Sequence, residues 1–265
     1  MQTFLPYPDF AASARVLDRA RLGKQRVETL QALRALVIPD YGWIRHPAIR
    51  MWMGYVPALT SYGLAMASEW ISRGHPDSTH RQILEFAPEV LQDTPIPLPP
   101  WLGAPELHES HRSNLIQKAP ELYRGAFPDT PADLPYYWPE PEEERVPADP
   151  AGNRLWIWRM PEGQDRPTLL LPPDPPGKRA GPKWERQLHV FEETVEDGDP
   201  VAVLAADHDR LRTGSLGPVL MHEDGLVRSI QLDGRMGRNV VEPPALLQDP
   251  RTFFGVGVPG GVRPR

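Results

Sequence analysis

The sequence predicts an α+β protein, in which an all-helical N-terminal domain precedes a small β-rich domain. Apolar residues recur at helical spacing through residues 1–138, and no strand-like alternation occurs there. After residue 153, short β-prone runs alternate with Gly, Asp and Pro. The stretch between the two patterns is acidic and rich in proline, as linkers are. We therefore expect a helical domain (1–138), a linker (139–153) and a β-rich domain (154–265).

The expected helices form a bundle of about five. Asp9 can cap a first helix that ends near Leu17. Pro47 suits the first turn of a later helix, and Pro57 should interrupt that helix near Tyr55. The predicted helical segments are 9–17, 21–37, 46–74, 79–86 and 105–118, with one further turn from Pro120.

The C-terminal half is predicted to be a small β-domain, for which an SH3-like barrel is one candidate. A partly ordered, proline-rich appendage is the alternative. The sequences Glu223-Asp224-Gly225 and Asp233-Gly234 are typical of hairpin turns. The predicted strands are Leu155–Trp158, Val201–Ala205, Val219–Met221, Leu226–Leu232 and Asn239–Val241.

Composition excludes some classes of site. The 265 residues include no cysteine, which rules out disulfides, thiolate zinc sites and cysteine nucleophiles. The net charge of −6 argues against a uniformly basic nucleic-acid binder, but residues 15–26 carry a local net charge of +4. Such a cluster suits either a phosphate-tracking surface or a solvated helix face. Its charged residues are Arg15, Arg19, Arg21, Lys24 and Arg26, opposed by Asp18.

The beginning of the sequence indicates an intracellular location. The residues MQTFLPYPDF lack the basic and apolar regions of a secretory signal. No apolar run approaches the ~20 residues that a membrane span requires. We expect a cytoplasmic, nucleoid-associated monomer that does not contact membranes.

Three short motifs occur in order along the helical half. They are RLGKQRVE (Arg21–Glu28), HPAIRMW (His46–Trp52) and HRSNL (His111–Leu115), the last followed by Lys118, Pro120 and Tyr123. Each motif alone is short, but their order and spacing together resemble a bacterial family related to the pyrimidine-dimer DNA glycosylase of phage, or endonuclease V. The resemblance covers about residues 1–138, and the β-rich half has no counterpart in the phage enzyme.

The resemblance implies a mostly helical fold that binds duplex DNA and extrudes a nucleotide. It also implies cleavage of the glycosidic bond by an amine nucleophile with help from a carboxylate, and no metal or dissociable cofactor. In the phage enzyme the amine is the N-terminus exposed after methionine removal. An α-amine, with a reference pKa of ~7.7–8.0 against ~10.4 for lysine, is more readily uncharged and able to attack.

The sequence departs from the family pattern at two points. Gln2 is too large for ordinary methionine removal, so the terminal amine is expected to belong to Met1. The family's carboxylate falls near Gly23 or Lys24, where no acid stands, and Glu28 is the nearest substitute. The candidate catalytic set is therefore Met1, Gln2, Lys24 and Glu28. Two alternatives stay open: Lys24 as the nucleophile, and Lys24–Glu28 as an ordinary ion pair on a helix surface.

The candidate nucleic-acid contacts are Arg21, Gln25, Arg26, His46, Arg50, His111, Arg112 and Lys118. Arginines are expected to hold phosphates while a nucleotide is extruded. His46 is alternatively a helix cap, and the residues of the third motif are alternatively a solvated helix face. Trp52, Tyr55 and Tyr62 suit either base stacking or a core. His108 and His111 lack a third ligand at a known spacing, so no metal site is expected.

These observations favour a DNA-repair enzyme, a DNA glycosylase with or without AP lyase activity (hydrolase or lyase). The alternative is a non-catalytic nucleic-acid-binding protein that kept the fold and lost the chemistry. A third hypothesis is an interaction protein whose β-rich domain performs the main task.

Overall fold

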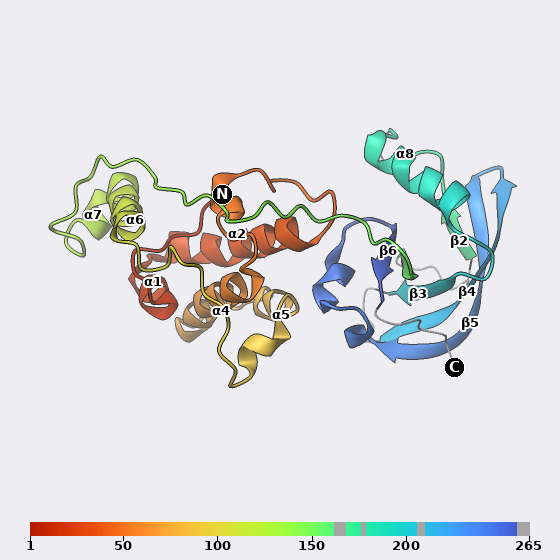
Figure 1. Ribbon diagram of the computed structural model, residues 1–265, viewed down its shortest axis with the longest axis horizontal. Coiled ribbons are helices and arrows are strands. Elements are labelled where there is room, and N and C mark those ends of the chain that lie inside the picture. The colour runs from red at the N-terminus through yellow and green to blue at the C-terminus, as the bar shows by residue number, and fades with distance from the viewer. Residues whose placement is uncertain (162–167, 176–178, 206–209, 259–265) are drawn as a thin grey trace. The chain divides into compact units, whose positions relative to one another are not determined.

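The computed structural model describes residues 1–161, 168–175, 179–205 and 210–258 (Figure 1). The chain divides into two compact units, Met1–Ala148 and Asp149–Arg265. The boundary falls inside the stretch 139–153, and residues 139–148 therefore belong to the helical unit. Among the helices in the described ranges, none is long and apolar enough to cross a membrane.

The regular structure of the N-terminal unit is helical. Asp9 caps α1 by accepting a hydrogen bond from the Ala12 N–H at 2.6 Å, as the sequence predicts, and Asp18 caps α2 in the same way. Residues 1–148 contain more helices than the five expected, because several are short. They are α1 (Phe10–Val16), α2 (Arg19–Val37), α3 (Pro47–Arg50), α4 (Val56–Ser72), α5 (His80–Leu84), the 3₁₀ helix η1 (Pro88–Leu91), α6 (Pro105–Lys118) and α7 (Pro120–Tyr123).

The interruption expected at Pro57 separates α3 from α4. Tyr55 precedes α4 in a non-helical conformation, and Pro57 lies in the first turn, where no backbone N–H is needed. Gly23, near the start of α2, serves close packing. A Cβ atom at this position would lie only 2.9 Å from the Trp70 ring on α4. The glycine in the first motif therefore lets α2 and α4 approach each other.

The C-terminal unit contains a curled six-stranded sheet with the order β2-β5-β4-β3-β1-β6 (Figure 1). β1 pairs with β3 in parallel, and the other neighbours are antiparallel. The SH3-like barrel is not confirmed by this arrangement. The strands are β1 (Arg154–Arg159), β2 (Thr168–Leu171), β3 (Pro200–Leu204), β4 (Arg210–His222), β5 (Gly225–Gly237) and β6 (Phe253–Gly257), and the helices are α8 (Pro182–His189), the π-helix η2 (Val190–Thr194), and the 3₁₀ helices η3 (Arg238–Val240) and η4 (Pro244–Gln248).

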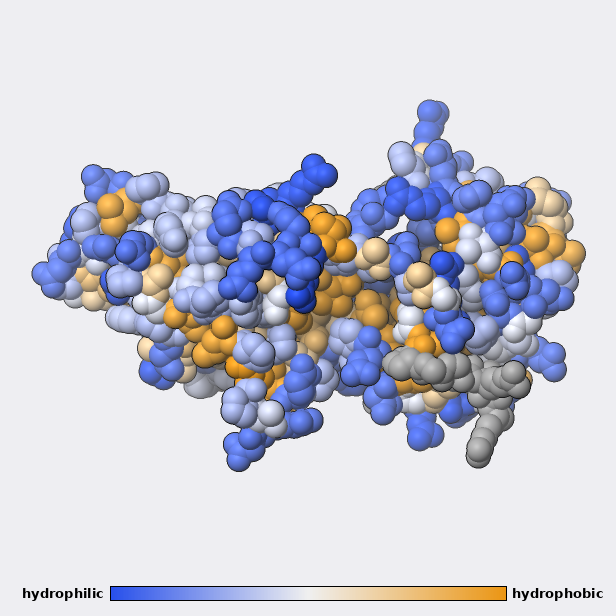
Figure 2. All heavy atoms as spheres, in the orientation of Figure 1, coloured by the Kyte–Doolittle hydropathy of each residue, from blue (hydrophilic) through white to orange (hydrophobic). Residues whose placement is uncertain are grey.

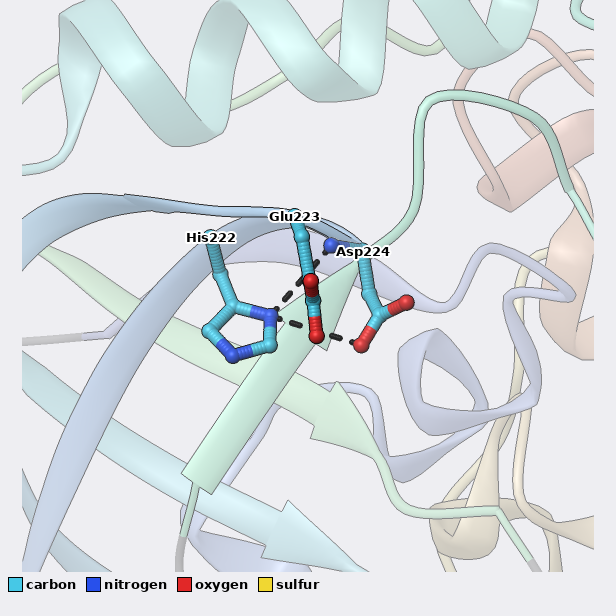
Figure 3. Close-up of side chains that lie close together, drawn as sticks. All are labelled: His222, Glu223 and Asp224. Carbon is cyan, nitrogen blue, oxygen red and sulfur yellow. Dashed lines mark hydrogen bonds and ion pairs between the residues drawn. The ribbon is translucent and has the colours of Figure 1, made fainter.

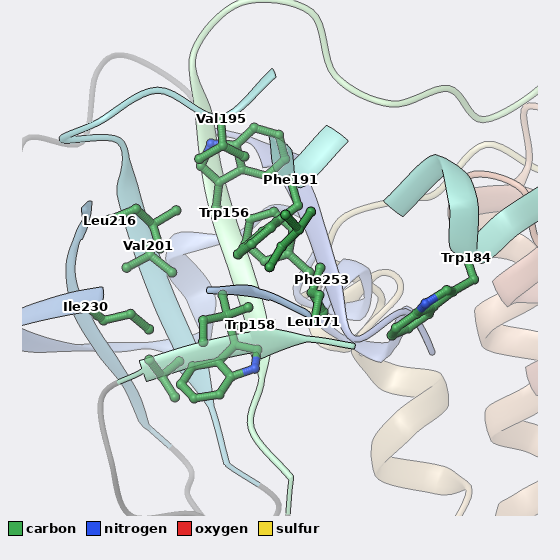
Figure 4. Packing of buried hydrophobic residues seen from close by; sticks show 13 residues of the cluster. Trp156, Trp158, Leu171, Trp184, Phe191, Val195, Val201, Leu216, Ile230 and Phe253 are labelled. Carbon is green, nitrogen blue, oxygen red and sulfur yellow. The ribbon is translucent and has the colours of Figure 1, made fainter. Parts of the chain in front are cut away.

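At its β1 strand this sheet is buried on both faces. Along β1, Trp156 and Trp158 point into one apolar cluster, while Leu155 and Ile157 point into the other, as the two-residue period of a strand requires. In the first cluster Trp156 stacks on Phe253 at 5.1 Å between ring centroids (Figure 4). Burial on both sides explains why β1 is a continuous apolar run in the sequence.

Two turn and strand predictions in this half were wrong. Asn239–Val241 does not form a strand, because η3 occupies Arg238–Val240. Asp233-Gly234 is not a hairpin turn. It lies within β5, where the register with β4 shifts opposite Thr213 and forms a bulge. The hairpin predicted at Glu223-Asp224-Gly225 is confirmed, and it joins β4 to β5.

Candidate active site

The first residues of the chain are buried among the helices. Gln2, Thr3, Phe4 and Leu5 expose 8, 1, 4 and 0% of their surface. The segment has no strand partner, so its peptide groups must find hydrogen bonds elsewhere. Side chains from α2, α4 and α6 supply these bonds and fix the path of the N-terminal segment.

Gln25 and Tyr62 hold the peptide groups of Phe4. The Phe4 N–H donates to Gln25 Oε1 at 2.8 Å. The Tyr62 hydroxyl lies 2.9 Å from the Phe4 carbonyl oxygen and 2.6 Å from Gln25 Oε1. Burial raises the pKa of Tyr62 well above its ordinary value, and the nearby Glu28 carboxylate adds to this effect. Gln25 is therefore a positioning residue rather than an exposed DNA contact.

Two histidines of α6 hold the next peptide group. His111 Nδ1 accepts the Leu5 N–H at 2.8 Å, and His108 Nδ1 lies 2.7 Å from the Leu5 carbonyl oxygen. His108 Nε2 accepts the N–H of Gly103, so its proton is on Nδ1 and is donated to Leu5. Burial lowers the pKa of His111 to about 3, and the residue is neutral. At His108 and His111 this helix therefore forms a buried clamp, and the alternative of a solvated face does not apply to these two residues.

This clamp places the terminal amine of Met1 beside Glu28. The amine nitrogen lies 4.0 Å from Glu28 Oε1, and Lys24 Nζ lies 3.9 Å from the same oxygen. Gln25 Nε2 donates to Glu28 Oε2 at 3.2 Å. The Glu28 side chain is 13% exposed and that of Lys24 is 74% exposed. One largely buried carboxylate thus contacts both candidate amines.

His46 belongs to the same constellation. Its Nδ1 accepts the Ala48 N–H at 3.2 Å and so caps α3. Burial lowers the pKa of His46, as does the positive charge of the terminal amine, while the Glu28 carboxylate opposes them. The capping role and a position near the amine therefore coexist in one residue. A neutral imidazole with Nδ1 as acceptor carries its proton on Nε2.

An aromatic wall that the sequence analysis missed completes this region. Tyr136 and Trp138 stack at 5.0 Å between ring centroids, and both contact the ring of His111 at 5.7 Å. Trp138 also packs edge-on against His46, and Tyr136 hydrogen-bonds with the side chain of Gln2. The sequence does contain a signal for this wall, the aromatic run Tyr136-Tyr137-Trp138. It was overlooked because it directly precedes the predicted linker.

Trp43 lies at the outer edge of the same region. Its side chain is 63% exposed, and its ring centroid is 6.2 Å from that of His46. Its φ of 77° falls in the left-handed region, which is costly for a residue with a Cβ atom. An exposed tryptophan held in this conformation beside His46 offers a flat surface for a base.

Two arginines of the first motif are engaged within the fold. Arg26 pairs with Asp77, whose side chain is 1% exposed, and its guanidinium lies 4.6 Å from the centroid of the Trp70 ring. Arg21 donates to the capping carboxylate of Asp18 at 2.7 Å. Neither contact brings its guanidinium to Glu28. The contact of Arg26 ties α2 to Asp77 and Trp70, whereas that of Arg21 lies at the N-terminus of α2 itself.

The remaining predicted contacts lie at separate places. Arg112 donates to the Pro6 carbonyl oxygen at 3.2 Å and so extends the clamp on the N-terminal segment. Arg50 pairs with Glu140 at 3.1 Å and also with Glu144. Lys118 is exposed in the last turn of α6.

The C-terminal unit offers weaker candidates. Among the described residues, one group of possible metal ligands has its ligand atoms within 4.8 Å of one another: His222, Glu223 and Asp224 (Figure 3). All three are exposed in the turn between β4 and β5, and His222 Nδ1 already contacts Asp224. The turn geometry accounts for the cluster, and we assign it no ligand.

The same unit has a polar cavity of about 310 Å³ beside β1 and β3. Its lining includes Arg154, Trp156, Glu196 and Asp199. Asp199 Oδ2 accepts from Trp156 Nε1 at 2.8 Å and from the Glu196 N–H at 2.9 Å, so the acid orders the cavity wall. Because these contacts give Asp199 a structural role, we assign the cavity no ligand.

Comparison with known proteins agrees with the geometry of the N-terminal unit. No curated protein and no solved structure gives a significant match to the chain. A family model described as pyrimidine dimer DNA glycosylase matches residues 1–82, which include Met1, Glu28 and His46. The match supports a DNA-glycosylase type of repair function and implies DNA as the substrate. The resemblance is thereby confirmed for residues 1–82, which contain the first two motifs and are similar to the pyrimidine dimer DNA glycosylases; the third motif, His111–Leu115, lies outside the matched residues.

Proposed function

We propose that the N-terminal unit is a DNA glycosylase that uses the Met1 amine as its nucleophile and Glu28 as its acid–base group. The observation that carries this proposal is the 4.0 Å separation of the amine nitrogen and Glu28 Oε1. Four buried positioning side chains, Gln25, Tyr62, His108 and His111, create this separation. Four buried side chains that hold one short segment are expected when the terminus of that segment must be positioned for a reaction.

The proposed reaction begins with an uncharged Met1 amine. Its lone pair attacks C1′ of an extruded nucleotide, and the bond from C1′ to the base breaks. The base leaves with the bonding electron pair and takes up a proton from water. Glu28 stabilises the cationic sugar, accepts a proton from the amine and passes it to the ring oxygen O4′ as the sugar ring opens and the Schiff base forms.

A lyase step can follow from the same intermediate. Loss of a proton from C2′ allows the 3′ phosphate to leave with its bonding electrons, which nicks the strand. Water then hydrolyses the imine and releases the amine. Glu28 and His46 are the groups in this region that can move these protons, because both lie near the amine.

Met1 is favoured over Lys24 by its surroundings. The Met1 side chain is 5% exposed and that of Lys24 is 74% exposed, so the lysine side chain lies mostly in solvent. An attacking amine gains most when its geometry is fixed in advance. Lys24 then serves to balance the charge of Glu28.

The aromatic residues give the proposed site a place for the extruded base. Trp138 and Tyr136 stack on each other near His46 and Gln2, and Trp43 is exposed at the edge. Stacking on aromatic rings is worth about 1–3 kcal/mol per base and tolerates different bases. Gln2 acts here as a positioning residue for Tyr136.

The decisive experiment is borohydride trapping with the full chain. Duplexes carrying a cyclobutane pyrimidine dimer, an abasic site or a modified base are incubated with the protein and borohydride, and the adduct is mapped by peptide mass spectrometry. We expect a covalent adduct on Met1, which the Lys24→Ala variant retains. An intact mass confirms that Met1 is present in the protein used. An adduct mapped to Lys24 shows that Lys24, not Met1, is the nucleophile. If no duplex gives an adduct or is cleaved, the enzyme proposal is overturned.

The second candidate is a non-catalytic nucleic-acid-binding protein. The Lys24–Glu28 pair at 3.9 Å favours it, because an i,i+4 ion pair gives Glu28 a purely structural role. This candidate predicts salt-dependent DNA binding without any trapped adduct.

A further inference from the structure

An acidic segment, Pro139–Arg145, lies against the start of α4 and the end of α3. Arg50 Nη2 lies 3.1 Å from Glu140 Oε2, and the same guanidinium also bonds Glu144. The Tyr55 hydroxyl donates to Glu142 Oε2 at 3.0 Å. Three carboxylates from one short segment therefore contact two side chains of one surface.

The contacts follow a strict alternation. Glu140, Glu142 and Glu144 face Arg50 and Tyr55, whereas Glu143 pairs with Arg145 at 2.7 Å within the segment. The chain bends at Glu142 and Glu143, so that Glu140 and Glu144 converge on one nitrogen of the Arg50 guanidinium. The segment thus turns a row of three carboxylates toward the helices, and in Figure 1 the chain after α7 passes beside the N-terminus, where Tyr136 hydrogen-bonds with Gln2.

The surface under this row adjoins the proposed active site. His46 caps the N-terminus of α3, and Arg50 is the last residue of the same helix. Trp138, which directly precedes the acidic segment, packs on the ring of His46. Figure 2 shows hydrophilic side chains gathered on this face of the N-terminal unit. A DNA strand whose nucleotide enters the site must place its neighbouring phosphates close to His46 and Arg50.

Carboxylates and phosphates compete for the same donors. The arginine fork binds either group with two parallel hydrogen bonds, and a tyrosine hydroxyl donates to either. Ion pairs as exposed as these, with Glu140 77% and Glu144 58% exposed, are weak and exchange readily. A row of phosphates can therefore displace the row of glutamates.

We propose that the surface formed by Arg50 and Tyr55 binds the phosphate backbone of DNA, and that Glu140, Glu142 and Glu144 occupy it as an internal competitor. The inference rests on the proposed function for the identity of the ligand. Binding of DNA to the full chain then requires the acidic segment to leave, which lowers the affinity for DNA and selects for duplexes that make further contacts in the site.

The test compares two triple variants of the full chain. Glu140→Gln/Glu142→Gln/Glu144→Gln removes the competitor, and Asp93→Asn/Glu121→Gln/Asp129→Asn makes the same change in net charge at exposed positions elsewhere in the unit. Affinity for an undamaged 15-base-pair duplex, a probe length of about one and a half turns, is measured by fluorescence anisotropy over a range of salt concentrations. Circular dichroism verifies that both variants are folded.

We expect the first variant to bind about ten-fold more tightly than the parent at low salt, with the difference shrinking as salt rises. The control variant should gain less than about three-fold, from net charge alone. Equal gains in the two variants overturn the inference, because they show a general charge effect.

A second comparison uses a variant of Arg50, the residue that binds two of the glutamates. In an Arg50→Gln background the triple substitution should no longer increase affinity, since the surface that the glutamates occupy is lost. A full gain in that background overturns the inference. Borohydride trapping with an abasic duplex is run in parallel, so that the two proposals are tested separately. If an adduct is trapped but the parent and the triple variant bind DNA equally well, only the competitor role of the glutamates is rejected. If the protein neither binds DNA nor forms an adduct, both proposals are rejected.

Discussion

The Met1 amine nitrogen and Glu28 Oε1 lie 4.0 Å apart, although Glu28 follows by more than one helical turn the place where the resemblance expects a carboxylate. Because the amine belongs to Met1, it starts one residue farther out than an amine exposed by methionine removal. The carboxylate is displaced along α2 as well. We infer that the two departures of the sequence compensate each other in space.

Replacing this carboxylate should separate binding from chemistry. Glu28→Gln keeps the size of the side chain and removes its charge, so we expect the rate of adduct formation to fall by about 10²–10⁴-fold. Affinity for DNA should change by less than about three-fold or should rise, because a negative charge is lost. Glu89→Gln, at an exposed position, is the control. Undiminished trapping by Glu28→Gln contradicts the assigned role.

Gln25 should prove to be a residue of stability and positioning. Gln25→Leu leaves the buried Phe4 N–H without its acceptor and removes a partner of the Tyr62 hydroxyl. An unsatisfied buried group costs about 1–3 kcal/mol, and we expect a loss of this size in the free energy of unfolding. Urea denaturation measures it, with the exposed Gln92→Leu as the control, for which a change within about 0.5 kcal/mol is expected. Similar values for the two variants speak against the clamp.

Acid should loosen the N-terminal segment through His111. Burial lowers the pKa of His111 to about 3, whereas an unfolded histidine has a pKa near 6.5. Between these values the unfolded chain binds the extra proton, so the free energy of unfolding falls as pH drops below about 6.5, by up to about 1.4 kcal/mol per pH unit from this residue. Above pH ~6.5 His111 is neutral in both states, and its contribution to the free energy of unfolding no longer changes with pH.

The variant His111→Asn tests this pH dependence. An asparagine side-chain oxygen can accept the Leu5 N–H but does not titrate in this range. Unfolding midpoints measured from pH 4 to 7.5 should therefore fall less steeply for the variant than for the parent. The pKa of His108 is also lowered by burial, so some dependence should remain. Identical slopes for variant and parent disprove the role of His111.

Arg26 is expected to matter more for stability than for DNA affinity. Its removal leaves the buried Asp77 carboxylate without its ion-pair partner, although this carboxylate also accepts hydrogen bonds from the backbone N–H groups of Thr79 and His80. We expect Arg26→Ala to lower the free energy of unfolding by about 2–4 kcal/mol, and Asp77→Asn in the same chain to recover part of this loss. Arg124→Ala, at an exposed position, is the control. A stable Arg26→Ala protein that has lost only DNA affinity contradicts the expectation.

The division of the chain predicts that the chemistry resides in one unit. A protein of residues 1–148 retains the N-terminal clamp and the acidic segment together. We expect it to form the trapped adduct at a rate within about three-fold of the full chain, because the chemical step uses only groups of this unit. Loss of trapping in a folded 1–148 protein supports instead the hypothesis that the β-rich half performs the main task.

Features that depend on neighbouring residues could be predicted from the sequence. Asp9 as a cap, the interruption at Pro57 and the hairpin at Glu223-Asp224-Gly225 all follow from local signals. Met1 and Glu28 could also be paired as candidates, because the three ordered motifs directed attention to them. Strands β2 and β6 and helix α8 were missed, because prolines and glycines surround them and their apolar residues pack against residues distant in the sequence.

The roles of single polar residues could not be predicted, because they depend on partners far along the chain. Arg26 looks like a phosphate ligand until Asp77 is found beneath it, and His111 looks exposed until Leu5 is found against it. Helical periodicity counts a histidine as polar, whereas α6 uses two histidines to bury a strand-like segment. A polar residue on an otherwise apolar face is the signal that remained, and it does not reveal the partner.

The clamp on Leu5 also imposes an order on biosynthesis. His111 follows Leu5 by 106 residues, so the ribosome must add about a hundred residues before the N-terminal segment can dock. At ~5–20 residues per second this interval is about 5–20 s. During that time the first residues remain open to deformylating and acetylating enzymes, and after docking Gln2, Thr3, Phe4 and Leu5 are buried. We therefore expect such modification of the amine to occur on the nascent chain, before the segment docks.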